Sequence, residues 1–191
     1  MPEAREQAEG NAILQHRGTR AVQRMVEFAP STGGLALWVQ HQDLADAAPT
    51  APLVATDGHT LRYAPAFAAL PLDEQAGHVA HEVLHVALRH AQRFLDLQRL
   101  IGDADLKLFN VCADAIVNST LAHLGWLRLA AHAVLLDRLL ASTLGIEQDL
   151  EASLLQWDVE RLYREIDDRR NSGRRGQQDE HSTGGREDGP R

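Results

Sequence analysis

The chain has 191 residues, of which 44% are hydrophobic, and a formal net charge of −8. This length fits one domain of ordinary size, and the acidic balance excludes a basic surface for nucleic acid or anionic lipid. The single cysteine excludes an intramolecular disulfide and fits a reducing compartment. No signal peptide or membrane-spanning run is recognisable, so we expect a cytoplasmic protein that acts without a membrane.

The N-terminal half is predicted to hold one helix and a small sheet. Residues 1–11 are polar, and we expect them to be disordered. Apolar residues recur at helical spacing over 12–28, which predicts an amphipathic helix. The short apolar run 35–40 fits a short buried strand or an interfacial turn of helix, because short apolar runs are ambiguous. Two strand-like pieces then flank Asp57 and Gly58, a dipeptide that favours a β-hairpin turn.

The C-terminal half is predicted to be helical. One helix should run over 72–97, because acidic residues open it and no glycine or proline interrupts its later part. A second should cover 103–123. The segment 127–140 is apolar and fits either a helix or an irregular covering segment. A last amphipathic helix is predicted over 146–168, and the residues 169–191 lack aliphatic and aromatic side chains, which predicts a disordered tail.

The most informative motif lies in the first of these helices, where His81, Glu82 and His85 read H-E-x-x-H. Residues four apart on a helix differ by about 40° around its axis, so both imidazoles can reach one metal ion. In this motif the histidines bind zinc and the glutamate is a general base toward water. Each histidine could instead be an ordinary core residue, but a buried, apolar helix needs partners for both rings. The pattern therefore predicts a Zn²⁺ site.

A catalytic zinc usually has three protein ligands, so a third is needed. Asn110, Asp114 and Asn118 stand four apart within the second helix and form a polar stripe on an otherwise apolar element. A short connection favours antiparallel packing of the two helices, which places the middle of one against the middle of the other. We therefore predict Asp114 as the third ligand, with Asn110 and Asn118 orienting the site.

Three histidines compete for the same position. His78 lies on the same helical face as the motif and remains open as a ligand or as a wall of the cleft. His90 would lie about 180° from His81 on a continuous helix, so we expect it to face away. His123 is too far along the second helix to share the metal.

Two further groups have a structural interpretation. Arg89 and Arg93 lie one turn apart and either bind an acidic substrate group or, as we expect, pair with Asp103 and Asp105 across the interhelical loop. Cys112 sits among apolar residues, and a buried thiol in such surroundings is usually unreactive.

Three segments in this order, 55–67, 79–93 and 110–118, together resemble the metallopeptidase domain of bacterial proteins that usually carry a von Willebrand factor A-like domain behind it. The resemblance extends over about residues 20–168. Three ordered motifs are far more specific than H-E-x-x-H alone. The chain has a hydrophilic tail where the A-like domain would begin, so we expect a short or truncated member.

The resemblance implies zinc held by His81, His85 and Asp114, with Glu82 as the base. It also implies association with a MoxR-type AAA+ ATPase. The sequence thus predicts an α+β fold: a mainly helical, zincin-like domain over 12–168, with a small β-hairpin or sheet before the H-E-x-x-H helix. The predicted function is hydrolysis of a peptide bond in a peptide or protein substrate by metal-activated water. The alternatives are hydrolysis of a non-peptide amide, and an inactive metal-binding scaffold that works with the ATPase or an A-like partner.

Overall fold

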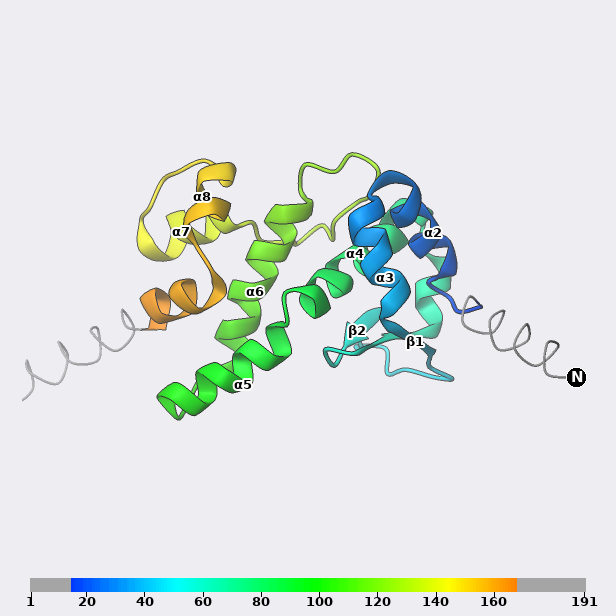
Figure 1. The fold of residues 1–191 in the computed structure, drawn as a ribbon, viewed down its shortest axis with the longest axis horizontal. Coiled ribbons are helices and arrows are strands. Elements are labelled where there is room, and N and C mark those ends of the chain that lie inside the picture. Colours follow the sequence, from blue (N-terminus) through cyan, green and yellow to red (C-terminus); the bar gives the residue numbers. More distant parts are fainter. Residues whose placement is uncertain (1–14, 168–191) are drawn as a thin grey trace, which may run out of the picture.

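The structure, a computed structural model, describes residues 15–167 and combines many helices with one small sheet (Figure 1). The predicted mainly helical α+β fold is confirmed. The elements in chain order are α2 (Thr19–Phe28), α3 (Pro30–Trp38), β1 (Gln40–Asp43), β2 (Val54–Thr56), β3 (Thr60–Tyr63), the 3₁₀ helix η1 (Pro65–Ala69), α4 (Leu72–Ala87), α5 (His90–Ile101), α6 (Leu106–Leu121), α7 (Leu136–Leu144) and α8 (Leu150–Gln156), followed by a helical segment at 159–167.

Two hydrophobic cores lie along the long axis of the molecule. One is formed by α2, α3, the sheet and α4, and the other by α5, α6, α7 and the C-terminal helices (Figure 1). Helix α6 belongs to both, because Val117 and Leu121 pack in the first core while Phe109 and Ala113 pack in the second. The middle of α6 therefore lies at the junction of the two cores.

The sheet has the order β1-β3-β2, with β1 parallel and β2 antiparallel to β3. The predicted hairpin is confirmed. Its turn uses Gly58 at φ 95°, and the Asp57 carboxylate accepts the backbone N–H groups of His59 (3.0 Å) and Thr60 (2.9 Å). Glycine suits this turn because a positive φ carries no Cβ penalty there. Strand β2 is left at the edge of the sheet and packs against α4.

Of the two alternatives for the run 35–40, the strand is wrong and the helix agrees with the structure. Helix α3 covers most of that run and begins at Pro30, which is well placed in a first helical turn because it has no N–H to leave unpaired. The described part of the preceding helix begins at Thr19. The predictions for residues 1–11 and for the start of the helix at 12 lie outside the described residues.

The single helix predicted over 72–97 is also wrong. It is two helices, α4 and α5, separated at Leu88 and Arg89. Arg89 has the left-handed values φ 56° and ψ 38°, and it is the one non-glycine residue with positive φ in the described chain. The chain turns there, so residues from His90 onward do not follow the helical phase of α4.

The remaining helices agree with the prediction in part. Helix α6 confirms the element expected over 103–123, and α7 begins at Leu136 after an irregular stretch. The single helix predicted over 146–168 is wrong, because it is interrupted at Trp157 and Asp158. The Asp158 carboxylate accepts the backbone N–H of Arg161 (2.8 Å), which caps a new helix. The predicted tail 169–191 lies outside the described residues.

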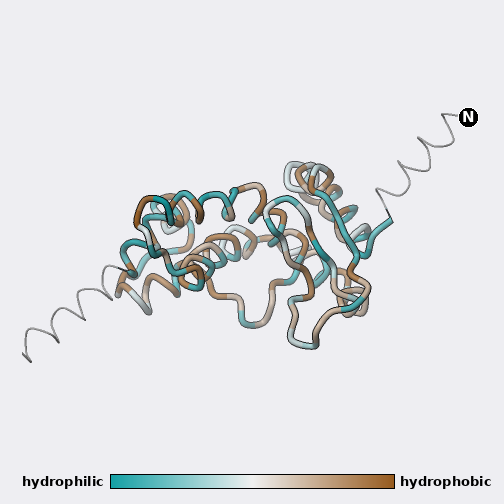
Figure 2. The backbone as a smooth tube through the Cα atoms, turned by 90° about the horizontal axis from the view of Figure 1, so that it is seen from below, coloured by the Kyte–Doolittle hydropathy of each residue, from teal (hydrophilic) through white to brown (hydrophobic). Residues whose placement is uncertain are grey.

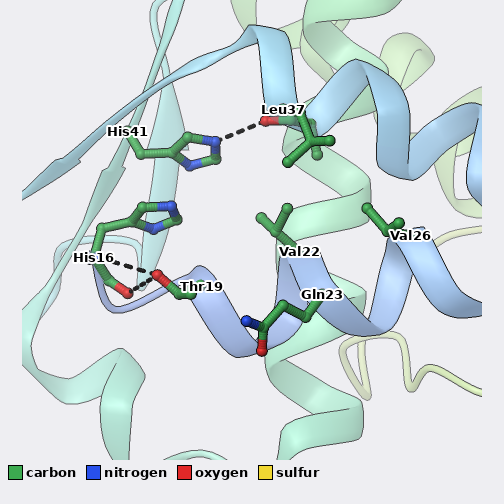
Figure 3. A pocket seen from close by; sticks show the side chains of 8 residues that line it. His16, Thr19, Val22, Gln23, Val26, Leu37 and His41 are labelled. Atoms are coloured by element: carbon green, nitrogen blue, oxygen red, sulfur yellow. Dashed lines mark hydrogen bonds between the residues drawn. The ribbon is translucent and has the colours of Figure 1, made fainter. Parts of the chain in front are cut away.

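A cluster of aromatic rings joins β1 to the start of α2 (Figure 3). The rings of His16 and His41 stack with centroids 4.0 Å apart. Because the Ala36 carbonyl can only accept, the His41 Nε2–H donates to it (2.8 Å), and Nδ1 accepts the Tyr63 hydroxyl (2.7 Å). A hollow of about 290 Å³, lined mainly by α2 and α3, lies beside these rings.

Apolar and polar stretches alternate along the described helices (Figure 2). Within residues 15–167, none of the helices combines the length and the apolar character needed to cross a membrane.

Candidate metal centre

Helix α4 places His81, Glu82 and His85 at the junction of the cores. Its first turn carries Asp73 and Glu74, which suit the positive end of the helix dipole. Its other side is anchored by fully buried apolar residues, among them Val79, Ala80 and Val83. Burial of that side fixes the rotation of the helix, so the two imidazoles face α6.

Helix α6 brings Asp114 to the same place. Asp105 caps the helix, because its carboxylate accepts the backbone N–H groups of Lys107 (2.8 Å) and Leu108 (3.2 Å). Ala113 and Ala115, on either side of Asp114, are buried. The aspartate carboxylate therefore projects from a well-anchored helix.

Three ligand-type atoms meet between these helices. His81 Nε2 and His85 Nε2 are 3.0 Å apart, and Asp114 Oδ1 lies 3.1 Å from His85 Nε2 and 3.4 Å from His81 Nε2. A tetrahedral zinc ion with bonds of about 2.0–2.1 Å needs donor atoms roughly 3.3 Å apart. The triangle thus has the size that a zinc ion requires, and three protein donors leave a coordination position free for chemistry.

The charges around this triangle favour a cation. Burial raises the pKa of the Asp114 carboxyl, but hydrogen bonds from His81 and His85 outweigh burial and hold this pKa well below its usual range. Burial also lowers the pKa of His81, yet Asp114 and Glu82 raise it above its ordinary value of 6.5. A cluster that attracts a proton in this way also attracts a metal ion, which competes with the proton for the same nitrogen.

Asn118 supports the first imidazole. Its Oδ1 lies 3.1 Å from Nδ1 of His81, and its Nδ2 donates to the Val134 carbonyl at 3.1 Å. The amide orientation is fixed by that carbonyl, so Oδ1 accepts the His81 Nδ1–H. Nε2 of His81 is then left with its lone pair for a metal, the usual arrangement of metal-binding histidines.

Glu82 faces the cleft beside the triangle. Burial raises the pKa of its carboxyl above the ordinary value. The neighbouring His81 and His85, and a hydrogen bond from the backbone N–H of Thr56 on β2, oppose this rise without cancelling it. A carboxyl with a raised pKa accepts a proton more readily near neutral pH, which is what a general base needs.

The cleft has a volume of about 610 Å³ and lies between the segment 50–54, which leads into β2, and residues between 130 and 134 after α6. His78 is part of its wall, together with His132. The sequence left His78 open as a metal ligand or as a wall of the cleft. It lies outside the cluster of three donor atoms that meet within 4.8 Å, so it is a wall residue.

His90 does not lie where a continuous helix would put it. It is 4% exposed, and its Nδ1 lies 3.1 Å from Nδ1 of His85. The prediction that His90 faces away is therefore wrong, because the left-handed Arg89 changes the direction of the chain. A left-handed conformation costs a residue with a Cβ about 1–2 kcal/mol. Asn110 lines a second hollow of about 370 Å³ with His85 and His90, on the other side of the site.

The predicted pairing of Arg93 with Asp103 or Asp105 is also wrong. Arg93 forms an ion pair with Glu160, with 2.7 Å between Arg93 Nε and Glu160 Oε1, and so joins α5 to the last helical segment. Arg89 is exposed at the turn. Cys112 is buried as predicted.

Residues 14–191 match a protein family described as "Putative metallopeptidase domain". The chain belongs to this family. The match includes the range of about 20–168 over which the resemblance was predicted. No curated protein and no solved structure matches the chain.

A member of a metallopeptidase family is expected to use a metal ion, and the group of His81, His85 and Asp114 is of a size to bind one. The sequence did not indicate His132 near this group, and it predicted the wrong position for His90. His132 lies in an irregular segment without periodicity, so nothing in the sequence placed it in the cleft. The position of His90 was predicted wrongly because no glycine marks the turn before it.

Proposed function

We propose that this chain is a zinc-dependent peptidase, with His81, His85 and Asp114 as zinc ligands and Glu82 as general base. The observation that carries the proposal is the triangle of donor atoms, 3.0 to 3.4 Å apart, beside a largely buried glutamate. The membership in a metallopeptidase family supports the same reaction class.

The chemistry divides between the metal and the glutamate. Zinc, when bound, polarises the scissile carbonyl and lowers the pKa of water. Glu82 takes a proton from the attacking water and passes it to the leaving amine, so that the amine departs uncharged. The raised pKa of Glu82 favours both transfers, because the carboxyl can hold the proton between them.

The cleft suits a neutral, extended chain. In the described part of the protein its lining includes neither lysine nor arginine, which argues against phosphate or another strongly anionic substrate. One wall leads into β2, an edge strand whose outer side is not paired within the sheet. A peptide can add to such an edge through main-chain hydrogen bonds, with its scissile bond above Glu82.

The test is cleavage of a peptide library, followed by mass spectrometry, with zinc-loaded wild type, Glu82→Gln and Glu74→Gln. Glu74 is two turns earlier on the same helix and pairs with Arg128, so it is a matched control outside the site. Wild type and Glu74→Gln should cleave, while Glu82→Gln should retain zinc and lose activity. Equal cleavage by wild type and Glu82→Gln would contradict the mechanism. If the wild type cleaved non-peptide amides but no peptides, hydrolysis of a non-peptide amide would be favoured instead.

A metal-dependent scaffold is the second candidate. The observation in its favour is that the donor atoms come from two helices, so a metal ion would link α4, in the first core, to α6, which packs in both cores. Such a scaffold would serve a MoxR-type AAA+ ATPase or a von Willebrand factor A-like partner. Unfolding on chelation, combined with no cleavage of any peptide by the wild type, would favour it over the peptidase.

A further inference from the structure

The two histidines of the triangle need partners for their second ring nitrogens. Asn118 fills this role for His81, as described above. For His85 the neighbour is another histidine, His90, whose Nδ1 lies 3.1 Å from Nδ1 of His85. The two rings meet edge to face, with centroids 4.8 Å apart and planes at 77°.

The hydrogen positions follow from the roles of the nitrogens. Nε2 of His85 faces Asp114 and His81, so binding a metal there requires its lone pair. Nδ1 of neutral His85 then carries the hydrogen and is the donor in the contact with His90. His90 must accept through Nδ1 and carry its own hydrogen on Nε2.

We propose that His90 is a positioning residue of the metal centre, which accepts the Nδ1–H of His85 and thereby fixes the ring orientation and tautomer that leave Nε2 free for zinc. The inference rests on the proposed metal centre but not on hydrolysis. The turn at Arg89 places His90 in this position, because α5 begins with His90 itself.

A simple packing role explains the same residue less well. Nε2 of His90 is buried and has no hydrogen-bond partner, and the ring packs edge to face on Phe109. An apolar side chain would fill this space without an unpartnered N–H. Packing alone therefore predicts that His90→Leu is neutral or stabilising and leaves zinc binding unchanged.

The experiment measures the zinc dissociation constant by competition with a chromophoric chelator. His90→Leu removes the acceptor, His90→Asn keeps an acceptor oxygen near the position of Nδ1, and His123→Leu is a control at an exposed histidine. We expect His90→Leu to weaken zinc binding about 10- to 100-fold, the range for partners of metal ligands. His90→Asn should stay within about threefold of wild type, by the same reasoning, and His123→Leu should be unchanged.

Wild-type affinity in His90→Leu, or an equal loss in His90→Asn, overturns the positioning role while leaving the metal centre intact. A wild-type protein that does not bind zinc overturns the metal centre and this inference together. Nitrogen-15 NMR of the zinc-loaded wild type tests the same point without a variant. It should show His90 protonated on Nε2 and not on Nδ1, and the opposite tautomer contradicts the proposal.

Discussion

Gly77 lies in α4 one turn before His81, where the helix meets the segment that walls the cleft. A Cβ built on Gly77 would lie 2.0 Å from the carbonyl oxygen of Arg128. Arg128 cannot easily move away, because its backbone N–H donates to the Asp73 carbonyl (2.9 Å) and its guanidinium pairs with Asp73 (2.9 Å) and Glu74 (3.1 Å). The methyl group added by Gly77→Ala would therefore push the backbone of α4 away from the backbone at Arg128.

The sign of the effect depends on two opposing contributions. Alanine in place of glycine stabilises a helix by about 1 kcal/mol, whereas overpacking typically costs about 1–3 kcal/mol. A shift of at least 1 Å is needed to bring this contact from 2.0 Å to 3.0 Å, which places the cost in the upper part of that range. We expect Gly77→Ala to lower the free energy of unfolding by about 1–2 kcal/mol.

Gly34 provides the matched control, because a Cβ added there in α3 meets nothing within 4 Å. Gly34→Ala should raise the free energy of unfolding by up to about 1 kcal/mol. Urea denaturation of the chelator-treated proteins, analysed by linear extrapolation, gives both values. If Gly77→Ala were stabilised as much as Gly34→Ala, the close approach of α4 to Arg128 would be refuted.

Three further predictions concern the metal centre. Asp114→Ala should raise the zinc dissociation constant at least about 100-fold, more than loss of a supporting residue does, while the exposed Asp96→Ala should not change it; equal affinities would exclude Asp114 as a ligand. Asn118→Ala should raise the same constant about 10- to 100-fold, because Nδ1 of His81 loses its acceptor, and an unchanged constant would contradict that role. The raised pKa of His81 stabilises the metal-free fold below its ordinary value of 6.5, and this contribution is lost as the pH rises through the folded pKa. Zinc requires the deprotonated ring, so the difference in melting temperature between zinc-loaded and chelator-treated protein should widen from about pH 6 to about pH 8; a constant difference would be evidence against competition between the proton and zinc.

Local sequence patterns predicted much of the arrangement around the site. The spacing of His81 and His85 depends only on helical geometry, which holds wherever the helix packs. The stripe containing Asp114 was visible because polar residues four apart stand out on an apolar helix. The structure brings these residues together because both helices bury their remaining faces, α4 in the first core and α6 in both cores.

The turn at Arg89 could not be predicted from the same patterns. Apolar periodicity continues through it, and a left-handed residue is usually marked by glycine or asparagine. Tertiary packing decides the conformation here: His90 is buried against His85 and Phe109, and Arg93 pairs with Glu160. These contacts are distant in sequence or depend on the turn itself, so a local pattern cannot show them.

At two other positions the sequence carries a local signal for the start of a helix. Pro30 is suited to the start of a helix, but the short apolar run 35–40 has the composition of a buried strand as well. Asp158 is a favourable N-cap, yet apolar residues on both sides continue the helical pattern over it. In both places the apolar residues nearby fit another structure as well, so the helix-start signal alone does not decide the outcome.

We propose that His81, His85 and Asp114 together hold one zinc ion. X-ray absorption at the zinc edge, on protein loaded with one equivalent of zinc, tests it most directly. We expect two imidazole ligands and a carboxylate oxygen at about 2.0–2.2 Å, with one imidazole lost in His81→Ala. A sulfur ligand, or a spectrum unchanged by His81→Ala, would contradict it.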